Sequence, residues 1–141
     1  MKYLLDTNVI SELQKPNYNK SVRSFVDTFS MERMYVSTIT LGELCYGIEK
    51  LPASKKKHEL SIWLYSTVFK WFYKRIIKFD SEIALTWGKI RAKAGRTLPY
   101  FDSLIAATAI ANNMCLVTKN VKDFEDIEGI NILNPWEFEV T

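Results

Sequence analysis

Short apolar runs alternate with amphipathic segments along the chain. The runs that predict strands fall at residues 3–5, 34–37, 75–79, 115–118 and 131–133. The first of them, Tyr3-Leu4-Leu5, has no polar residue in alternation, which is typical of a strand that is buried on both faces. The sequence therefore predicts four or five short strands, with the first of them inside the sheet.

Between these runs, apolar residues recur at helical spacing. The spacing predicts helices at residues 9–13, 22–29, 40–51, 60–73, 81–94 and 101–111, and a helical turn at 120–125. Strands that alternate with helices indicate a parallel sheet with helices on both faces. We expect an α/β protein with a three-layer α/β/α fold and a central, mainly parallel sheet of four or five strands.

Length and composition limit the class of protein. The 141 residues suffice for a single domain over 1–141, and 48% apolar with 25% charged residues excludes a disordered or collagen-like chain. No run is apolar enough to span a membrane, and Asp6 interrupts the N-terminal apolar residues. We expect a cytoplasmic protein whose cysteines, Cys45 and Cys115, are reduced. The net charge of +3 permits a polyanionic partner but does not require one.

Three acidic residues stand where such a fold forms its sites, beyond the carboxyl ends of the strands. Asp6 directly follows the first predicted strand, and Glu43 lies near the start of a predicted helix. Each has a structural alternative. Asp6 can act as an N-cap, although Thr7 and Asn8 could do so instead, and Glu43 can form a capping box with Thr40.

Asp102 is the most informative of the three. It opens a helix that is apolar on nearly all sides, on a face that continues through Ile105, Ala106 and Ala109. A carboxylate on a buried face is costly unless a capping interaction or a metal ion compensates its charge. Several carboxylates in one crevice repel each other, and a divalent cation removes that penalty. Oxygen ligands select Mg²⁺ or Mn²⁺, whereas one His and two apolar-flanked Cys do not form an ordinary zinc site.

Five segments together resemble a known family. They are residues 4–12 (LLDTNVISE), 36–44 (VSTITLGEL), 101–109 (FDSLIAATA), 116–124 (LVTKNVKDF) and 134–136 (NPW). In this order and at this spacing, they resemble the PIN-domain ribonucleases, and among them the VapC-type toxins of type II toxin–antitoxin systems. The resemblance extends nearly from end to end and is carried by the set of motifs rather than by any one of them.

The resemblance implies a site and a reaction. It implies that Asp6, Glu43 and Asp102 bind Mg²⁺ or Mn²⁺, and that a metal-activated water hydrolyses RNA phosphodiester bonds. It also implies that Thr7, Asn8 and Thr118 line the pocket, as partners of the ligands or as substrate contacts. The implied partners are RNA, a cognate antitoxin protein that blocks the site, and a second copy of the chain in a homodimer.

Two features leave alternatives open. The family's fourth acidic position falls at Asn120, which offers a carbonyl oxygen but no charge, so either Asn120 or Asp123 is a candidate fourth ligand. Lys89, Lys93 and Arg96 fall on one helix face and are candidates for binding the RNA backbone. Basic residues on a helix are also common where the face is simply solvated.

Three rival functions remain at this stage. A receiver-type regulatory domain also uses acids and Mg²⁺ at strand ends, but its acids lie at strand termini, whereas Glu43 and Asp102 fall in helices. A degenerate PIN module would bind RNA or protein without cleavage, and the residue Asn120 keeps that reading open. The third rival is an RNA-processing nuclease with no toxin role.

Overall fold

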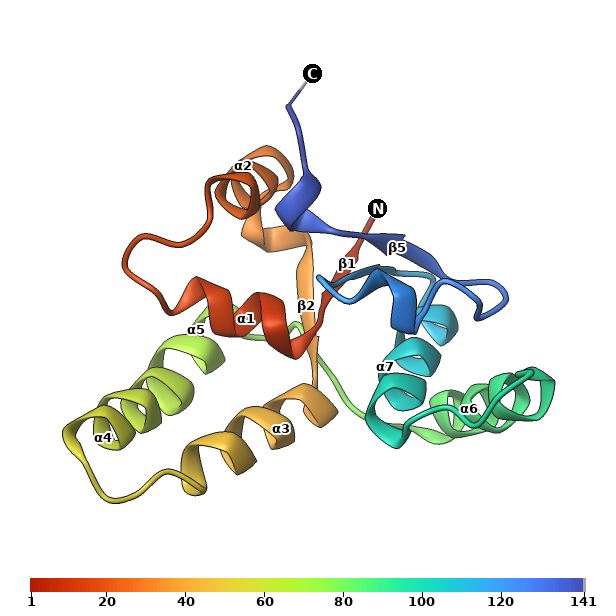
Figure 1. Cartoon of the computed structure of the whole chain (residues 1–141), viewed down its shortest axis with the longest axis horizontal. Coiled ribbons are helices and arrows are strands. Elements are labelled where there is room, and N and C mark those ends of the chain that lie inside the picture. Colours follow the sequence, from red (N-terminus) through yellow and green to blue (C-terminus); the bar gives the residue numbers. More distant parts are fainter. Residues whose placement is uncertain (141) are drawn as a thin grey trace.

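The computed structural model describes residues 1–140, in which five strands alternate with helices (Figure 1). The strands are β1 (Tyr3–Leu5), β2 (Met34–Ser37), β3 (Ile76–Ile77), β4 (Cys115–Val117) and β5 (Asn131–Leu133). The α-helices are α1 (Thr7–Leu13), α2 (Lys20–Phe29), α3 (Thr38–Glu49), α4 (Lys55–Ile62), α5 (Phe69–Trp71), α6 (Ser81–Lys93) and α7 (Tyr100–Ala111). A π-helical segment, η2 (Trp63–Val68), joins α4 to α5, and short 3₁₀ turns are η1 (Met31–Arg33), η3 (Val121–Asp123) and η4 (Pro135–Glu137).

The strands form one parallel sheet in the order β3-β2-β1-β4-β5. The chain builds outward from β1 on one side through β2 and β3, and then crosses to the other side for β4 and β5. The change of direction therefore lies between β1 and β4. Open α/β sheets bind ligands at this point, beyond the carboxyl ends of the two strands.

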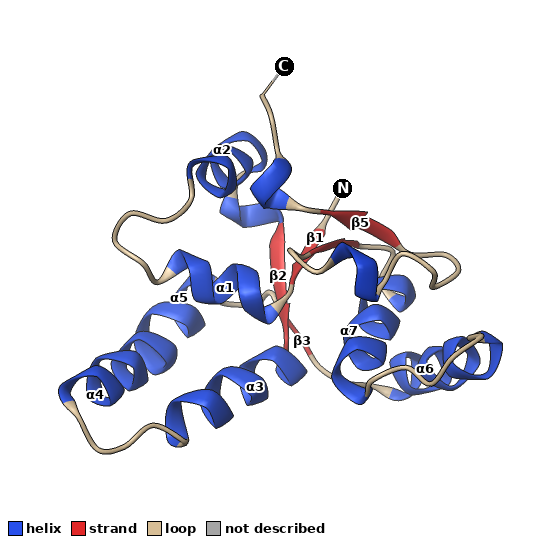
Figure 2. Cartoon of the chain, viewed as in Figure 1, coloured by secondary structure: helices blue, strands red, loops and turns tan. Residues whose placement is uncertain are grey.

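Alternate residues of each strand face two different cores, because side chains on a strand point to opposite faces. Tyr3 and Leu5 of β1 pack with α1, α2, α3 and η2 on one face, whereas Leu4 packs with α7 on the other. Figure 2 shows the sheet between these two groups of helices, with α6 outside α7. The three-layer α/β/α fold with a five-stranded parallel sheet confirms the fold predicted from the sequence.

Several predicted boundaries are wrong in detail. The helix predicted to begin at Thr40 begins at Thr38, because the Ser37 hydroxyl caps it by accepting a hydrogen bond from the Ile39 N–H at 2.9 Å. Thr40 is fully buried inside the helix, so it forms no capping box with Glu43.

The third strand and the helix before it also differ from their predicted ranges. The strand expected at 75–79 pairs only over Ile76–Ile77, and the helix expected at 60–73 starts at Lys55 and contains the π segment. Arg75 explains the late start of the strand. Its backbone N–H donates to the Phe72 carbonyl (2.7 Å), so only its carbonyl joins the pairing, where it accepts from the Val36 N–H (3.2 Å). Its guanidinium donates to the carbonyls of Met31, Met34 and Trp71.

Both cysteines are free thiols, as predicted, and Cys115 is buried in β4, where burial raises the pKa of its thiol to about 11. Within residues 1–140, no helix combines the length and the apolar character that crossing a membrane requires.

Because β1 holds the centre of the sheet, truncating Leu4 in it should destabilise the protein strongly. Leu4 is fully buried, so Leu4→Ala is expected to lower the free energy of unfolding by about 2–5 kcal/mol. Leu85→Ala makes the same change at a residue that is 68% exposed and should stay within about 0.5 kcal/mol of the wild type. Chemical denaturation followed by circular dichroism measures both. Equal losses for the two variants would contradict the assignment of β1 to the core.

Candidate functional site

The Asp6 carboxylate lies at the carboxyl end of β1, beside the end of β4. The Asp6 backbone N–H donates to the Val117 carbonyl (2.9 Å), and the residue is only 9% exposed. Its Oδ1 accepts from the Thr7 N–H (2.8 Å), and its Oδ2 accepts from the Thr118 hydroxyl (2.9 Å) and the Asn8 side-chain amide (3.3 Å). Asp6 is therefore the N-cap of α1 and also the most buried acid of the site. A capping role and a role in the site are compatible for this residue.

Thr7, Asn8 and Thr118 form a small network around that carboxylate. The Asn8 amide donates to the Thr118 hydroxyl (3.3 Å), and its carbonyl oxygen accepts from the Lys119 N–H (3.2 Å). The Thr118 hydroxyl also accepts from the Asn120 N–H (3.1 Å). The polar residues that the sequence places after β1 and β4 thus tie the two strand ends together.

Glu43 reaches the same place from the first half of α3. Its Oε1 accepts a hydrogen bond from the Thr7 hydroxyl at 2.9 Å, across 36 residues of sequence. The second carboxylate oxygen has no hydrogen bond within residues 1–140 and is free to bind a ligand. Thr7 therefore holds Asp6 through its backbone and Glu43 through its side chain.

Asp102 enters from the first turn of α7, whose N-cap is Pro99. A proline N-cap offers no side-chain oxygen, and no side-chain capping bond closes this helix start. The Asp102 carboxylate accepts no hydrogen bond within residues 1–140, so the structure does not support the reading of Asp102 as a cap.

These groups line one pocket of about 270 Å³ at the carboxyl end of the central strand β1. It is lined by Asp6, Thr7, Asn8, Glu43, Phe101, Asp102, Ile105 and Asn120, and we call it the carboxylate pocket. Phe101 and Ile105 were not predicted as site residues. Ile105 had a signal in the sequence, because it follows Asp102 by three residues on the same helix face. Phe101 had none, because adjacent residues of a helix do not share a face.

The electrostatics of the pocket begin with Asp6. Burial raises the pKa of its carboxyl above the usual value, and the nearby charge of Asp123 raises it further. Hydrogen bonds from Thr118, Thr7 and Asn8 act in the opposite direction, because they favour the ionised form. These bonds make it less costly to keep a negative charge here.

The other two carboxylates are also perturbed by their surroundings. Burial raises the pKa of Glu43, and the charges of Asp6 and Asp102 raise it further. Burial raises the pKa of Asp102 as well, with added contributions from Asp123 and Asp6, while Arg96 lowers it. The three carboxylates of the pocket thus repel one another, Asp123 adds repulsion from outside the pocket, and Arg96 opposes that repulsion at Asp102.

Such a pocket fits a divalent cation in charge and in donor chemistry, because all its acidic donors are carboxylate oxygens. Within residues 1–140, however, no three Asp, Glu, His or Cys side chains are arranged to hold one ion together. An ion in this pocket would therefore be held by these acids partly through its bound waters. Mg²⁺ commonly keeps several waters in this way.

The two candidates for the fourth ligand occupy different places. Asn120 lines the carboxylate pocket, whereas Asp123, in η3, does not. Asp123 is close enough to act through its charge, since it raises the pKa of both Asp6 and Asp102. The fourth position in the pocket, Asn120, therefore carries no charge, and the additional negative charge comes from Asp123, outside the pocket lining.

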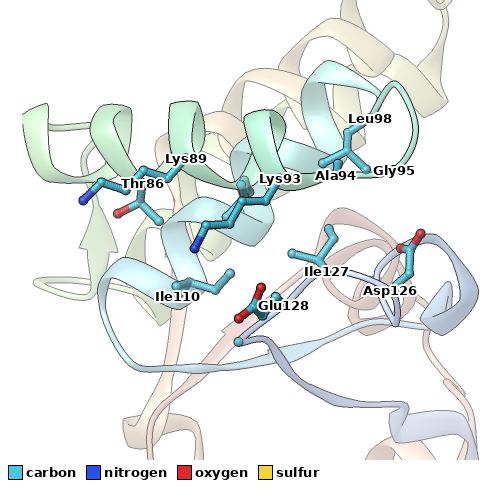
Figure 3. A pocket seen from close by; sticks show the side chains of 12 residues that line it. Thr86, Lys89, Lys93, Ala94, Gly95, Leu98, Ile110, Asp126, Ile127 and Glu128 are labelled. Atoms are coloured by element: carbon cyan, nitrogen blue, oxygen red, sulfur yellow. The ribbon is translucent and has the colours of Figure 1, made fainter.

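The three basic residues considered for RNA binding lie outside the carboxylate pocket. Lys89 and Lys93 of α6 line a cavity of about 420 Å³ between α6 and residues 126–129, and Figure 3 shows both on α6, with Ile110, Ile127 and Glu128 opposite. Arg96 binds the Asp126 carboxylate (2.8 Å) and the Asp123 carbonyl (2.8 Å). A role for these residues in RNA binding stays a prediction.

Comparison with known proteins identifies the family. The PIN domain matches residues 3–130. The chain is similar to the plasmid stability protein StbB of Pseudomonas syringae (37% identical; 95% of this chain, 98% of that protein) and to the VapC ribonuclease Y4jK of Sinorhizobium fredii (34%; 95% and 97%). It is also similar to the toxin FitB of Neisseria gonorrhoeae, at 35% identity over 94% of this chain and 97% of FitB.

Solved structures show the same relationship in three dimensions. The chain superimposes on a chain of FitAB bound to an IR36 DNA fragment with a TM-score of 0.88, at 34% identity over 98% of both chains. A toxin–antitoxin complex from Klebsiella pneumoniae gives a TM-score of 0.70 at 26% identity, over 97% of this chain and 100% of that one. By its matched domain, its near full-length relatives and its fold, the chain belongs to the PIN-domain family, in the group that contains the VapC ribonucleases and FitB.

Proposed function

We propose that this protein is a divalent-metal-dependent endoribonuclease and the toxin of a type II toxin–antitoxin pair. One observation carries the proposal. Asp6, Glu43 and Asp102, which come from three distant segments of a PIN-domain chain, line one pocket at the switch point of the sheet. The relatives named as a ribonuclease and a toxin cover nearly the whole chain, which supports the same assignment.

Asp6, Glu43 and Asp102 would hold the cation, which we take to be Mg²⁺ or Mn²⁺ because the donors are hard oxygens. When bound, such an ion supplies an activated water and neutralises charge on a phosphoryl oxygen. The chain itself positions the three carboxylates. Thr118 and Asn8 fix one oxygen of Asp6, Thr7 fixes one oxygen of Glu43, and both oxygens of Asp102 stay free.

An antitoxin is the expected protein partner. The FitAB structure and the Klebsiella pneumoniae complex each contain a relative of this chain in a two-component assembly. We propose a cognate antitoxin that covers the carboxylate pocket, and a homodimer of the toxin itself. We also propose that the protein acts in the cytoplasm, where it would meet its RNA substrate.

Removing a pocket carboxylate should abolish cleavage without unfolding the chain. Asp6→Asn and Asp102→Asn should each lower the cleavage rate by more than about 100-fold, since losing even a partner of a ligand costs about 10–100-fold. Total RNA is incubated with each protein in Mg²⁺, in Mn²⁺ and in EDTA, and fragments are resolved by electrophoresis. Asp27→Asn removes an exposed acid on α2 and serves as the control. Equal cleavage by the wild type and both variants would reject the site.

The pH profile should report the perturbed carboxyls. Because the pKa values of Asp6, Glu43 and Asp102 are all raised, activity should fall on acidification at a higher pH than for ordinary carboxyls. Thr118→Val removes a bond that favours ionised Asp6, so the acid limb of kcat/KM should move further upward. Thr108→Val removes a buried hydroxyl that bonds only the Leu104 carbonyl, and it should leave the limb in place. A Thr118→Val profile that overlays the wild type would show that this bond does not tune the site.

The missing fourth acid can be tested by restoring it. Asn120→Asp adds a carboxylate to the pocket lining and should lower the Mn²⁺ concentration that gives half-maximal cleavage. Asp123→Asn removes the negative charge just outside the pocket lining and should raise that Mn²⁺ concentration. Isothermal titration of Mn²⁺ into the folded proteins measures metal affinity without relying on activity. It should rank Asn120→Asp above the wild type and Asp123→Asn below it. An unchanged metal affinity in both variants would contradict the roles given to these positions.

Asn120 is also the one observation that favours a non-cleaving module. If the wild type binds RNA without cutting it and Asn120→Asp cuts, the chain is a binding module that has lost its fourth acid. If the wild type cuts in Mg²⁺ or Mn²⁺, the enzyme assignment holds.

A further inference from the structure

Arg96 joins two loops that are far apart in the sequence. It lies in the loop between α6 and α7, and its side chain reaches the loop after β4; Figure 3 shows the two loops facing each other, at Gly95 and at Asp126. Its Nε donates to one oxygen of Asp126 (2.8 Å), and its Nη2 donates to the other (3.1 Å) and to the Asp123 carbonyl (2.8 Å). A guanidinium bound at two points to a carboxylate has a defined orientation. Arg96 therefore fixes the spacing of the two loops, and we call these contacts the Arg96 bridge.

Each of the two loops leads to a part of the carboxylate pocket. The first runs into α7, whose first turn carries Asp102, and the second begins with Asn120, directly before η3. Both residues line the pocket. Near the Arg96 bridge, Leu98 of the first loop and Ile127 of the second belong to one apolar core. A change in the spacing of the loops would thus move Asp102 relative to Asn120.

Asp102 depends on this spacing more than the other two carboxylates do. The Asp6 carboxylate accepts a hydrogen bond from the Thr118 hydroxyl, and the Glu43 carboxylate accepts one from the Thr7 hydroxyl. The Asp102 carboxylate accepts none within residues 1–140. Its position is therefore set by the backbone at the start of α7, which the preceding loop holds in place.

The charges around the Arg96 bridge favour its role as a link. Burial, and then the charge of Asp123, raise the pKa of Asp102, so the two acids lie within reach of each other's charge and repel. Arg96 opposes this repulsion. The hydrogen bond with Asp126 raises the pKa of Arg96, and the charges of Asp123 and Asp102 raise it further. Arg96 is thus the positive group among three acids on the two loops.

We propose that Arg96 is a positioning residue for the carboxylate pocket, because its bonds to Asp126 and to the Asp123 carbonyl hold Asp102 in place beside Asn120. Arg96 is not part of the pocket lining, so it acts through Asp102 and not on a bound ion directly. This inference rests on the proposed metal-dependent function. It adds a residue outside the pocket on which metal binding depends.

The sign of the change in metal affinity separates positioning from a simple effect of charge. A positive side chain near a metal site repels the ion, so if Arg96 acted only through its charge, Arg96→Gln would tighten Mn²⁺ binding. If Arg96 holds Asp102 in place, Arg96→Gln should weaken Mn²⁺ binding by about 2- to 30-fold, the range for residues that act through a network of contacts. Isothermal titration of Mn²⁺ into the metal-free proteins measures this affinity.

Arg96→Lys gives a second, independent test. Lysine keeps the positive charge but cannot form the two-point contact with Asp126. Arg96→Lys should therefore also weaken Mn²⁺ binding, by less than Arg96→Gln does. Asp126→Ala breaks the Arg96 bridge from the other side, and the double variant Arg96→Gln/Asp126→Ala should bind Mn²⁺ no more weakly than Arg96→Gln, because both changes remove the same contact.

The control is Arg23→Gln, which makes the same change of charge at an exposed residue of α2 and should leave Mn²⁺ affinity unchanged. The Arg96 and Asp126 side chains are 39% and 55% exposed, and an ion pair this exposed adds little to global stability, so all variants should stay folded by circular dichroism. Mn²⁺ binding that is unchanged or tighter in Arg96→Gln would overturn the proposal.

Hydrogen–deuterium exchange of the metal-free protein separates this proposal from the nuclease proposal. Arg96→Gln should speed exchange at the backbone amides of Ser103, Asp123 and Phe124, whereas Arg23→Gln should not. Faster exchange beside a wild type that neither binds Mn²⁺ nor cuts RNA would support the positioning of the loops by Arg96 and reject the metal-dependent enzyme. A wild type that binds Mn²⁺ and cuts, with exchange and affinity unchanged in Arg96→Gln, would support the enzyme and reject the role of Arg96.

Discussion

Asp6 carries its carboxylate at a position that is 9% exposed, and hydrogen bonds from the chain compensate that charge in place of water. A buried ion is tolerated only where such bonds replace its hydration. Here they come from Thr7 and Asn8, directly after Asp6, and from Thr118, at the end of the neighbouring strand β4. The pairing of β1 with β4 brings Thr118 to Asp6, and so it helps to stabilise the ionised form of the Asp6 carboxyl.

The rest of the pocket adds repulsion to this arrangement. Glu43 and Asp102 each add a negative charge within reach of Asp6, and burial together with this repulsion raises their pKa values. The fold accepts this electrostatic cost because its large apolar cores, on both faces of the sheet, hold the helices that carry the acids. A divalent cation would relieve this repulsion, which connects the acidic pocket with the proposed metal-dependent chemistry.

Within residues 1–140, no Lys or Arg side chain lines the carboxylate pocket. The net charge is only +3, Lys89 and Lys93 lie at another cavity, and Arg96 is already paired. Electrostatic attraction by itself would hold a polyanion weakly and without regard to its form.

The order of strands and helices, and the three acids at their ends, follow from the sequence alone because they depend on neighbours a few residues apart. Periodicity and turn residues report such local relations directly. The sequence could not indicate that Thr7 bonds Glu43 or that Phe101 lines the pocket. Those facts depend on how segments separated by tens of residues pack against one another, and only the tertiary structure decides which side chains meet there.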